Sequence, residues 1–97
     1  MFARTTHIQG PPDHLDDAIR QYREETLPAA RGHAGFAGGM LLADRRTGDA
    51  VAITLWETEE NMSASEQMAS QQRAQVSATA GASGEPQVAR YEVVVSL

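Results

Sequence analysis

The residues that could carry out chemistry are few and are spread along the chain. Trp56 ends an apolar run, Arg73 falls in a later stretch rich in Ala, Ser and Gln, and His7 lies among residues typical of a strand. A tryptophan can form one wall of a pocket for a flat ring, an arginine can stabilise an oxyanion, and a histidine is a common general base. We take these three as the candidate catalytic residues. Packing in the core is the alternative role for Trp56.

Several kinds of site are excluded by composition. The chain has no cysteine, and all 8 of its basic residues are arginine. Thiolate nucleophiles, disulfides, iron–sulfur clusters and Schiff-base lysines are therefore ruled out. His7, His14 and His33 lack metal-ligand spacing, so we expect no metal site. No catalytic triad, phosphate-binding loop or carboxylate pair is present either, and we expect no cofactor.

The overall composition is that of one small globular domain spanning residues 1–97. Hydrophobic residues make up 41% and charged residues 22% of the sequence, which is typical of a soluble domain. The net charge of −5 disfavours a nucleic-acid partner, because phosphate binding needs a concentrated basic surface. No apolar run is long enough for a membrane span or a signal peptide. We expect a cytoplasmic protein without a membrane partner.

The elements that must position the candidate residues follow from periodicity and turn signals. Apolar and β-branched runs predict four strands, at residues 2–8, 36–43, 50–56 and 88–97. Helical spacing predicts two helices, at residues 12–27 and 59–79. Pro28 should end the first helix, because a proline disfavours helical geometry in the residue before it. Thr58 is placed to cap the second.

The order strand–helix–strand, repeated twice, predicts a ferredoxin-like βαββαβ sandwich of the α+β class. In this fold a four-stranded antiparallel sheet carries both helices on one face. The turn at residues 44–48, which has an Asp at its start and a Gly at its end, should join the two middle strands as a hairpin. Gly38 and Gly39 within a strand indicate a bulge or a close approach by another group.

The strands are apolar on both sides, which predicts a second covering layer. Strand alternation places Val51, Ile53 and Leu55 on one face and the smaller Ala52 and Thr54 on the other, with Trp56. The last strand, residues 88–97, is also largely apolar on both faces. Helices cover only one face of such a sheet, so a second copy of the chain is expected to cover the other. We predict a homodimer with its sheets packed face to face.

The helix-covered side should contain an underfilled pocket. The second helix offers only Met62, Met68 and Val76 as larger apolar residues, and it would pack on the small side chains of the third strand. Methionines can line an adaptable pocket or fill the core. We predict a site for a small aromatic molecule, lined by Met40, Ala52, Thr54, Trp56, Met62 and Arg73. Met40 belongs to this site if the register of its strand places it on the helix-covered face.

Four short motifs resemble the antibiotic biosynthesis monooxygenase-like family. Leu55-Trp56-Glu57-Thr58 precedes an acidic helix start, and His33-Ala34-Gly35-Phe36 enters the second strand. The turn at residues 44–48 and the segment Arg90-Tyr91-Glu92-Val93 complete the likeness, which covers essentially the whole chain. The resemblance implies a dimeric α/β barrel. It leaves activity open, because the family includes cofactor-free oxygenases and haem degraders, and fold alone does not determine function.

The functional residues of that family are largely replaced here. Haem-degrading members carry an Asn, a Trp and an axial His at places that fall on Thr6, Ser65 and Gln75, so haem ligation of the family type is not expected. The quinone-forming oxygenases use an Asn, a Trp, a Tyr and an Arg. These places fall on Ala52, Trp56, Met62 and Val76. Only the tryptophan is retained, although Arg73 lies one helical turn before the last place.

Two functional hypotheses follow. The first is a cofactor-independent monooxygenase, or a related isomerase, acting on an aromatic or quinol-like metabolite held against Trp56, with Arg73 stabilising its oxyanion. The second is a dimeric protein that binds a ligand, or has only a structural role, without turnover. The absent Asn and Tyr favour the second hypothesis, and the small residues of the third strand favour a pocket. The sequence does not identify the substrate.

Overall fold

The computed structural model describes residues 1–97 and confirms the predicted fold class. The elements alternate as strand, helix, strand, strand, helix, strand, although each of the two helices is divided into segments. The strands are β1 (Phe2–Gln9), β2 (Phe36–Ala43), β3 (Asp49–Trp56) and β4 (Gln87–Glu92). The helices are a 3₁₀ turn (Pro12–His14), α1 (Leu15–Gln21), a π-helical segment (Tyr22–Thr26), α2 (Leu27–Arg31), α3 (Glu59–Ala64) and α4 (Glu66–Thr79).

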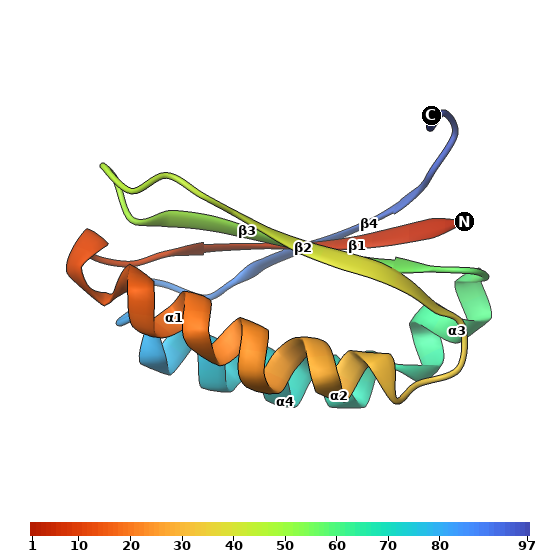
Figure 1. Ribbon diagram of the computed structural model, residues 1–97, viewed down its shortest axis with the longest axis horizontal. Coiled ribbons are helices and arrows are strands. Elements are labelled where there is room, and N and C mark those ends of the chain that lie inside the picture. Colours follow the sequence, from red (N-terminus) through yellow and green to blue (C-terminus); the bar gives the residue numbers. More distant parts are fainter.

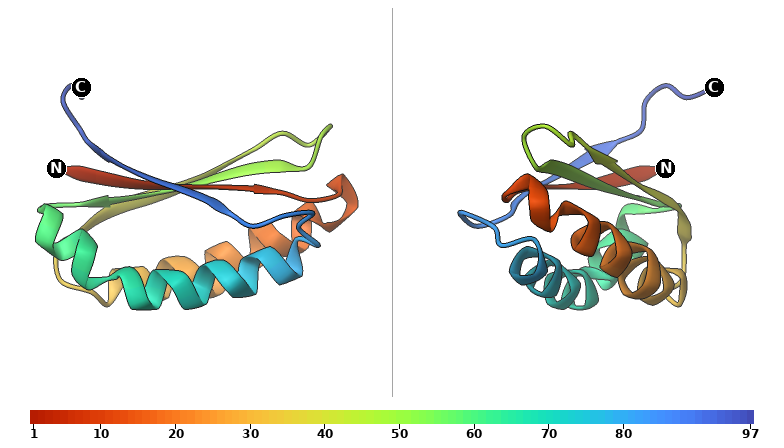
Figure 2. Two further views of the ribbon diagram at one scale, coloured as in Figure 1. Left: turned by 180° about the vertical axis from the view of Figure 1, so that it is seen from behind. Right: turned by 60° about the vertical axis from the view of Figure 1, so that its left-hand side comes forward.

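The four strands form one antiparallel sheet in the order β2-β3-β1-β4. All helices lie on one face of this sheet, and the opposite face is open (Figures 1 and 2). We call these the helix face and the outer face. The predicted alternation of β3 is confirmed, because Ala52, Thr54 and Trp56 line the space beneath the helices. Leu55, Ile53 and Val51 therefore point to the outer face.

The first helix, made of α1, the π-helical segment and α2, continues past the predicted end at residue 27. Pro28 is accommodated at the start of α2, and the helix runs on to Arg31. A proline inside an α-helix clashes with the carbonyl four residues earlier. Here the preceding turns, Tyr22–Thr26, are π-helical, and their wider spacing accommodates the ring where an ordinary α-helix would not. The prediction that Pro28 ends the first helix was wrong for this reason.

The second helix, which was predicted to be continuous, is broken once, at Ser65, into α3 and α4. Thr58 caps α3 as expected, with its hydroxyl accepting a hydrogen bond from the Asn61 backbone N–H at 3.0 Å. Ser65 is fully buried between α3 and α4. The carbonyl of Met62, in the last turn of α3, accepts a hydrogen bond from a side chain of β1, Arg4 (2.6 Å). The helix thus breaks at the point where a helical carbonyl accepts a hydrogen bond from Arg4, a residue distant in sequence.

The predicted features of β2 and its turn are confirmed, whereas the last strand is shorter than expected. A register shift lies between Phe36 and Gly38, and Gly38 has a φ of 144°. At Gly39 a Cβ atom would lie 2.6 Å from Leu27, so the close approach is also real. Strand β4 ends at Glu92 instead of residue 97. The Val93 backbone N–H still donates to the Met1 carbonyl at 2.8 Å, and the chain after it turns to the side away from the helices (Figures 1 and 2).

The core consists of two small clusters at opposite ends of the helix face. One contains Ala30, Trp56 and Met62, and the other is built around Ile8 and Val76. Between them the packing is incomplete, and that space is the site described below. No helix in the chain combines the length and the apolar character needed to cross a membrane.

Candidate functional site

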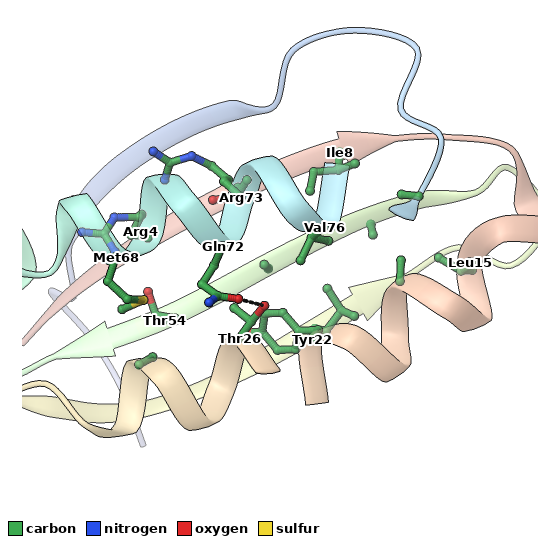
Figure 3. Close-up of a pocket in the computed structure, with 18 of the residues that line it drawn as sticks. Arg4, Ile8, Leu15, Tyr22, Thr26, Thr54, Met68, Gln72, Arg73 and Val76 are labelled. Carbon is green, nitrogen blue, oxygen red and sulfur yellow. Dashed lines mark hydrogen bonds between the residues drawn. The ribbon is translucent and has the colours of Figure 1, made fainter. Parts of the chain in front are cut away.

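A cavity of about 60 Å³ lies between the sheet and the two helices that cover its helix face (Figure 3). Thirteen of its 21 lining residues are hydrophobic. The floor comes from the helix face of the sheet, mainly from alternating residues of β1 and β3. These floor residues are Arg4, Thr6, Ile8, Leu41, Ala50, Ala52, Thr54 and Trp56.

One wall is a row of residues spaced four apart, Ala18, Tyr22, Thr26 and Ala30. In a regular α-helix, a spacing of four drifts around the axis by about 40° per step, because each turn takes 3.6 residues. The π-helical segment has more residues per turn, and it therefore keeps this row facing the cavity. The π-helix is a local irregularity with a consequence for the site, since it aligns Tyr22 and Thr26 with it.

The other wall is the inner face of α4, which presents Met68, Ala69, Gln72, Arg73 and Val76. Gln72 connects the two walls, because its side-chain oxygen accepts a hydrogen bond from the Thr26 hydroxyl at 3.2 Å (Figure 3). The predicted shortage of larger apolar residues on this helix is therefore visible in the structure. Small and polar residues of α4 face small residues of β3, and the space between them is left unfilled.

Trp56 closes one end of the cavity and is itself fully buried. Its ring meets Phe36 edge-on, with centroids 5.6 Å apart, a favourable aromatic geometry. The indole N–H donates to the Thr54 hydroxyl at 3.0 Å, so its one polar group is satisfied within β3. Trp56 thus serves both as a core residue and as a cavity wall.

A cluster of four charged residues adjoins the cavity at the same end, and two of them line it. Arg4, the third residue of β1, is only 3% exposed. Its Nη2 lies 3.1 Å from Glu66 Oε2. The other Glu66 oxygen accepts a hydrogen bond from Arg73 at 2.7 Å, and Arg90 lies 2.9 Å from Glu66 Oε2. We call these residues, Arg4, Glu66, Arg73 and Arg90, the arginine cluster.

The arginine cluster contains three guanidinium groups and one carboxylate. Arg4 and Arg90 are directly opposite on neighbouring strands, where like charges repel. Glu66 lies between them and offsets part of this repulsion. Burial would raise the pKa of Glu66, but hydrogen bonds from Arg73 and Arg90 and the charge of Arg4 lower the pKa below its ordinary value. Burial also lowers the pKa of Arg4, against the attraction of Glu66.

Two buried N–H groups of the arginine cluster have no hydrogen-bond partner. They are Nε of Arg4 and Nη1 of Arg73. Arg4 otherwise donates to the Met62 carbonyl and to the Ser65 hydroxyl, at 2.6 and 3.1 Å, and its guanidinium lies 5.8 Å from the Trp56 ring. Buried polar groups are nearly always paired in proteins. The cluster is therefore rich in positive charge and incompletely satisfied.

Tyr22 is buried in the middle of the cavity wall, and its hydroxyl is engaged by the sheet. It lies 3.1 Å from the Met40 carbonyl and 3.3 Å from the Ile53 carbonyl, to which it can donate. Burial raises the pKa of Tyr22 to about 12. A phenol with this pKa stays protonated at neutral pH and does not act as a base.

Four of the predicted pocket residues line the cavity, namely Ala52, Thr54, Trp56 and Arg73. Met40 does not, because its register partner is Ile53 and both point to the outer face. Met62 is buried beside Trp56 and Ala30 instead of facing the cavity.

His7, the candidate base, lies away from the cavity. It pairs with Val51 in the sheet register and therefore points to the outer face. There its Nε2 is 3.8 Å from Asp49. No three His, Asp or Glu side chains lie close enough together to hold a metal ion.

Sequence reasoning missed Arg4, Glu66 and Arg90. Two signals could have revealed Arg4 and Glu66. Arg4 alternates with Phe2, Thr6 and Ile8, which places a charge on the helix face of a central strand. Glu66 and Arg73 are seven residues apart, two helical turns, and so share one face of α4.

The lining limits the chemistry that the site can perform. Its ionisable side chains are Arg4, Arg73 and Tyr22. None of these accepts a proton at neutral pH, since arginine stays charged and Tyr22 stays neutral. The cavity can enclose an apolar molecule, exclude water and stabilise negative charge at the arginine end. It offers no general base from a single chain.

No family model matches the sequence. The uncharacterized protein Rv2557 of Mycobacterium tuberculosis is 34% identical over 93 residues, which are 96% of this chain and 41% of that protein. The chain thus spans about two fifths of the length of this relative.

Among solved structures, the chain is similar to a monooxygenase from the gene ActVA-Orf6 of Streptomyces coelicolor in complex with nanaomycin D. The TM-score is 0.78 at 18% identity, covering 99% of this chain and 89% of that one. SnoaB, a cofactor-independent oxygenase from Streptomyces nogalater, gives a TM-score of 0.72 at 14% identity, covering 99% and 95%. The predicted resemblance to antibiotic biosynthesis monooxygenases is confirmed, and at these identities it establishes the fold.

Proposed function

We propose that this chain binds a small aromatic metabolite in the cavity between its sheet and helices. The observation that carries the proposal is a concave, partly open and mostly apolar space with a few polar groups at defined places. Such spaces are the usual form of small-molecule sites. The similar fold of the monooxygenase bound to nanaomycin D supports a ligand on the same architecture. Because the chain spans part of its relative's length, the proposal concerns this domain.

Assembly into a homodimer through the outer face belongs to the same proposal. Met40, Leu42 and Tyr91 are about half exposed there, at 48%, 52% and 58%. Val51, Ile53 and Leu55 lie between them on β3. A contiguous apolar face of this kind on a sheet is typical of an interaction surface. A second copy offers the same surface and would cover it.

Cofactor-independent oxygenation is the second candidate function. The observation that favours it is positive charge from Arg4 and Arg73 beside Trp56, where a bound quinol could lie as its anion. That anion would pass one electron to dioxygen, and the resulting semiquinone and superoxide would combine at a ring carbon. The peroxide would take up the proton released on ionisation of the quinol, and loss of water from the hydroperoxide would leave a hydroxylated quinone. The absence of a base in the lining weighs toward binding without turnover.

One experiment separates the two functions. Hydroquinone is added to the purified protein with and without dioxygen, while quinone absorbance and Trp56 fluorescence are followed. Binding without turnover predicts a fluorescence change in both atmospheres and a quinone yield equal to that of buffer. Oxygenation predicts enzyme-dependent quinone formation only in air. If neither fluorescence nor absorbance responds to hydroquinone, to larger quinols or to other single-ring aromatic molecules, the proposed ligand site is wrong.

A further inference from the structure

The cavity is small for a multi-ring ligand, and its polar end is positively charged. Its volume of about 60 Å³ is below that of an engineered cavity of about 150 Å³ that holds benzene. The walls therefore have to move apart to admit even one aromatic ring, and a single ring with a short substituent is the upper limit for the ligand. The charged residues Arg4 and Arg73 lie toward one end with Met68, whereas Leu15 lies toward the other (Figure 3).

The positive end lacks its full complement of negative charge. Glu66 contacts all three guanidinium groups of the arginine cluster. One carboxylate cannot neutralise three cations, and Arg90 is the only one of them with substantial exposure to water, at 46% of its side chain. Arg4 is 97% buried by the same measure, and its Nε is unpaired. Arg4 and Arg73 both line the cavity, and each carries one buried N–H group without a hydrogen-bond partner.

We propose that the ligand of this cavity is an aromatic carboxylate, held with its ring along the apolar lining and its carboxylate against Arg4 and Arg73. The planar guanidinium matches a carboxylate in shape and donor spacing. This inference rests on the proposed function of the cavity as a ligand site. It narrows that function to one chemical class.

The absence of a base favours a carboxylate over a phenol. A phenol has a pKa near 10 and a carboxylic acid one near 4 in water. The lining offers no group that could remove the proton of a phenol, so a ligand that is anionic before it enters is the better match. Glu66 then competes with the ligand for the same guanidinium groups.

Benzoate and benzamide form a matched pair of probes, because they have the same size and differ in charge. Binding is followed by the fluorescence of Trp56, the only tryptophan. Benzoate should bind at least about tenfold more tightly than benzamide, since hydrogen bonds to charged groups contribute enough for that ratio. Arg73→Gln should abolish most of this difference. Arg20→Gln, an exposed arginine paired with Asp17, is the control and should leave it unchanged.

Glu66→Gln supplies a test that a purely structural role would not pass. Removal of the competing carboxylate should raise benzoate affinity, while benzamide affinity stays the same. The variant also keeps both unpaired arginine groups intact, so it does not depend on the folding of an Arg4 variant. Equal binding of the two probes, or weaker benzoate binding in Glu66→Gln, overturns the carboxylate proposal and leaves the cavity's ligand role standing. If neither probe binds, the carboxylate proposal falls, and the hydroquinone titration decides whether the cavity binds a ligand at all.

Discussion

Arg4 is a charged side chain on the buried side of a central strand, and its neighbours explain how the fold tolerates it. Burial of a charge is costly unless it is paired and hydrogen-bonded. Arg4 has the Met62 carbonyl, the Ser65 hydroxyl and Glu66 as partners, and it lies near the face of Trp56. Removing one partner leaves a buried charge uncompensated, which is more damaging than losing the pair as a whole.

Glu66 provides a prediction about acid stability. Its pKa is lowered in the folded chain, so it contributes stability that is complete above its unfolded pKa and is lost as pH falls through the folded pKa. Glu66→Gln should lower the free energy of unfolding at neutral pH. The difference from the wild type should shrink under acid conditions. Urea unfolding across the acid range measures this, and a difference that grows toward low pH would contradict it.

Tyr22 provides the corresponding prediction at high pH. Its pKa rises from 10.0 to about 12 on folding, so its contribution is complete below pH 10 and is lost as pH rises toward 12. A shift of this size corresponds to roughly 2–3 kcal/mol. The wild type should therefore lose more stability than Tyr22→Phe over this range, as measured by urea unfolding. Parallel losses in the two proteins would show that the hydroxyl is not protected as described.

At the scale of elements, the break between α3 and α4 depends on a long-range contact. Ser65 accepts a hydrogen bond from Arg4 at 3.1 Å and donates one to the Met62 carbonyl at 2.7 Å. Ser65→Ala should lower the free energy of unfolding by about 1–2 kcal/mol, because it leaves buried polar groups less well satisfied. Chemical denaturation measures the effect. Ser70→Ala, at an exposed position of α4, is the matched control. An equal effect in both variants would count against the contact.

The same elements show what could be predicted from sequence. Strand periodicity was enough to place Ala52, Thr54 and Trp56 on the helix face, and turn chemistry was enough for the hairpin. No glycine or proline marks the break at Ser65. The break arises from the contact between Ser65 and Arg4, which is 61 residues away in sequence. The continuation through Pro28 depends on a π-helical segment, for which the local sequence carries no clear signal. Three of the four residues of the arginine cluster were missed, and Arg4 among them looked like an ordinary strand residue.

For the whole molecule, the open outer face predicts dimerisation. Leu42 lies on the edge strand β2 and is 52% exposed on this apolar face, and a glutamate there would place a charge in the proposed interface. Leu42→Glu should convert the dimer to a folded monomer in sedimentation at micromolar concentration. Gln71→Glu, which adds the same charge on the exposed side of α4, should leave the dimer intact. A wild-type protein that sediments as a stable monomer would contradict the proposed assembly.

The central claim is that the space above Ala52 is a ligand site instead of closely packed core. The most direct test compares the unfolding free energy and benzoate-induced rise in Tm of the wild type with those of Ala52→Ile, whose β-branched side chain suits a strand. We predict that the unliganded variant is at least as stable as the wild type and that benzoate no longer raises its Tm. A loss of about 1–3 kcal/mol, typical of overpacking, with the benzoate effect retained, would contradict the claim.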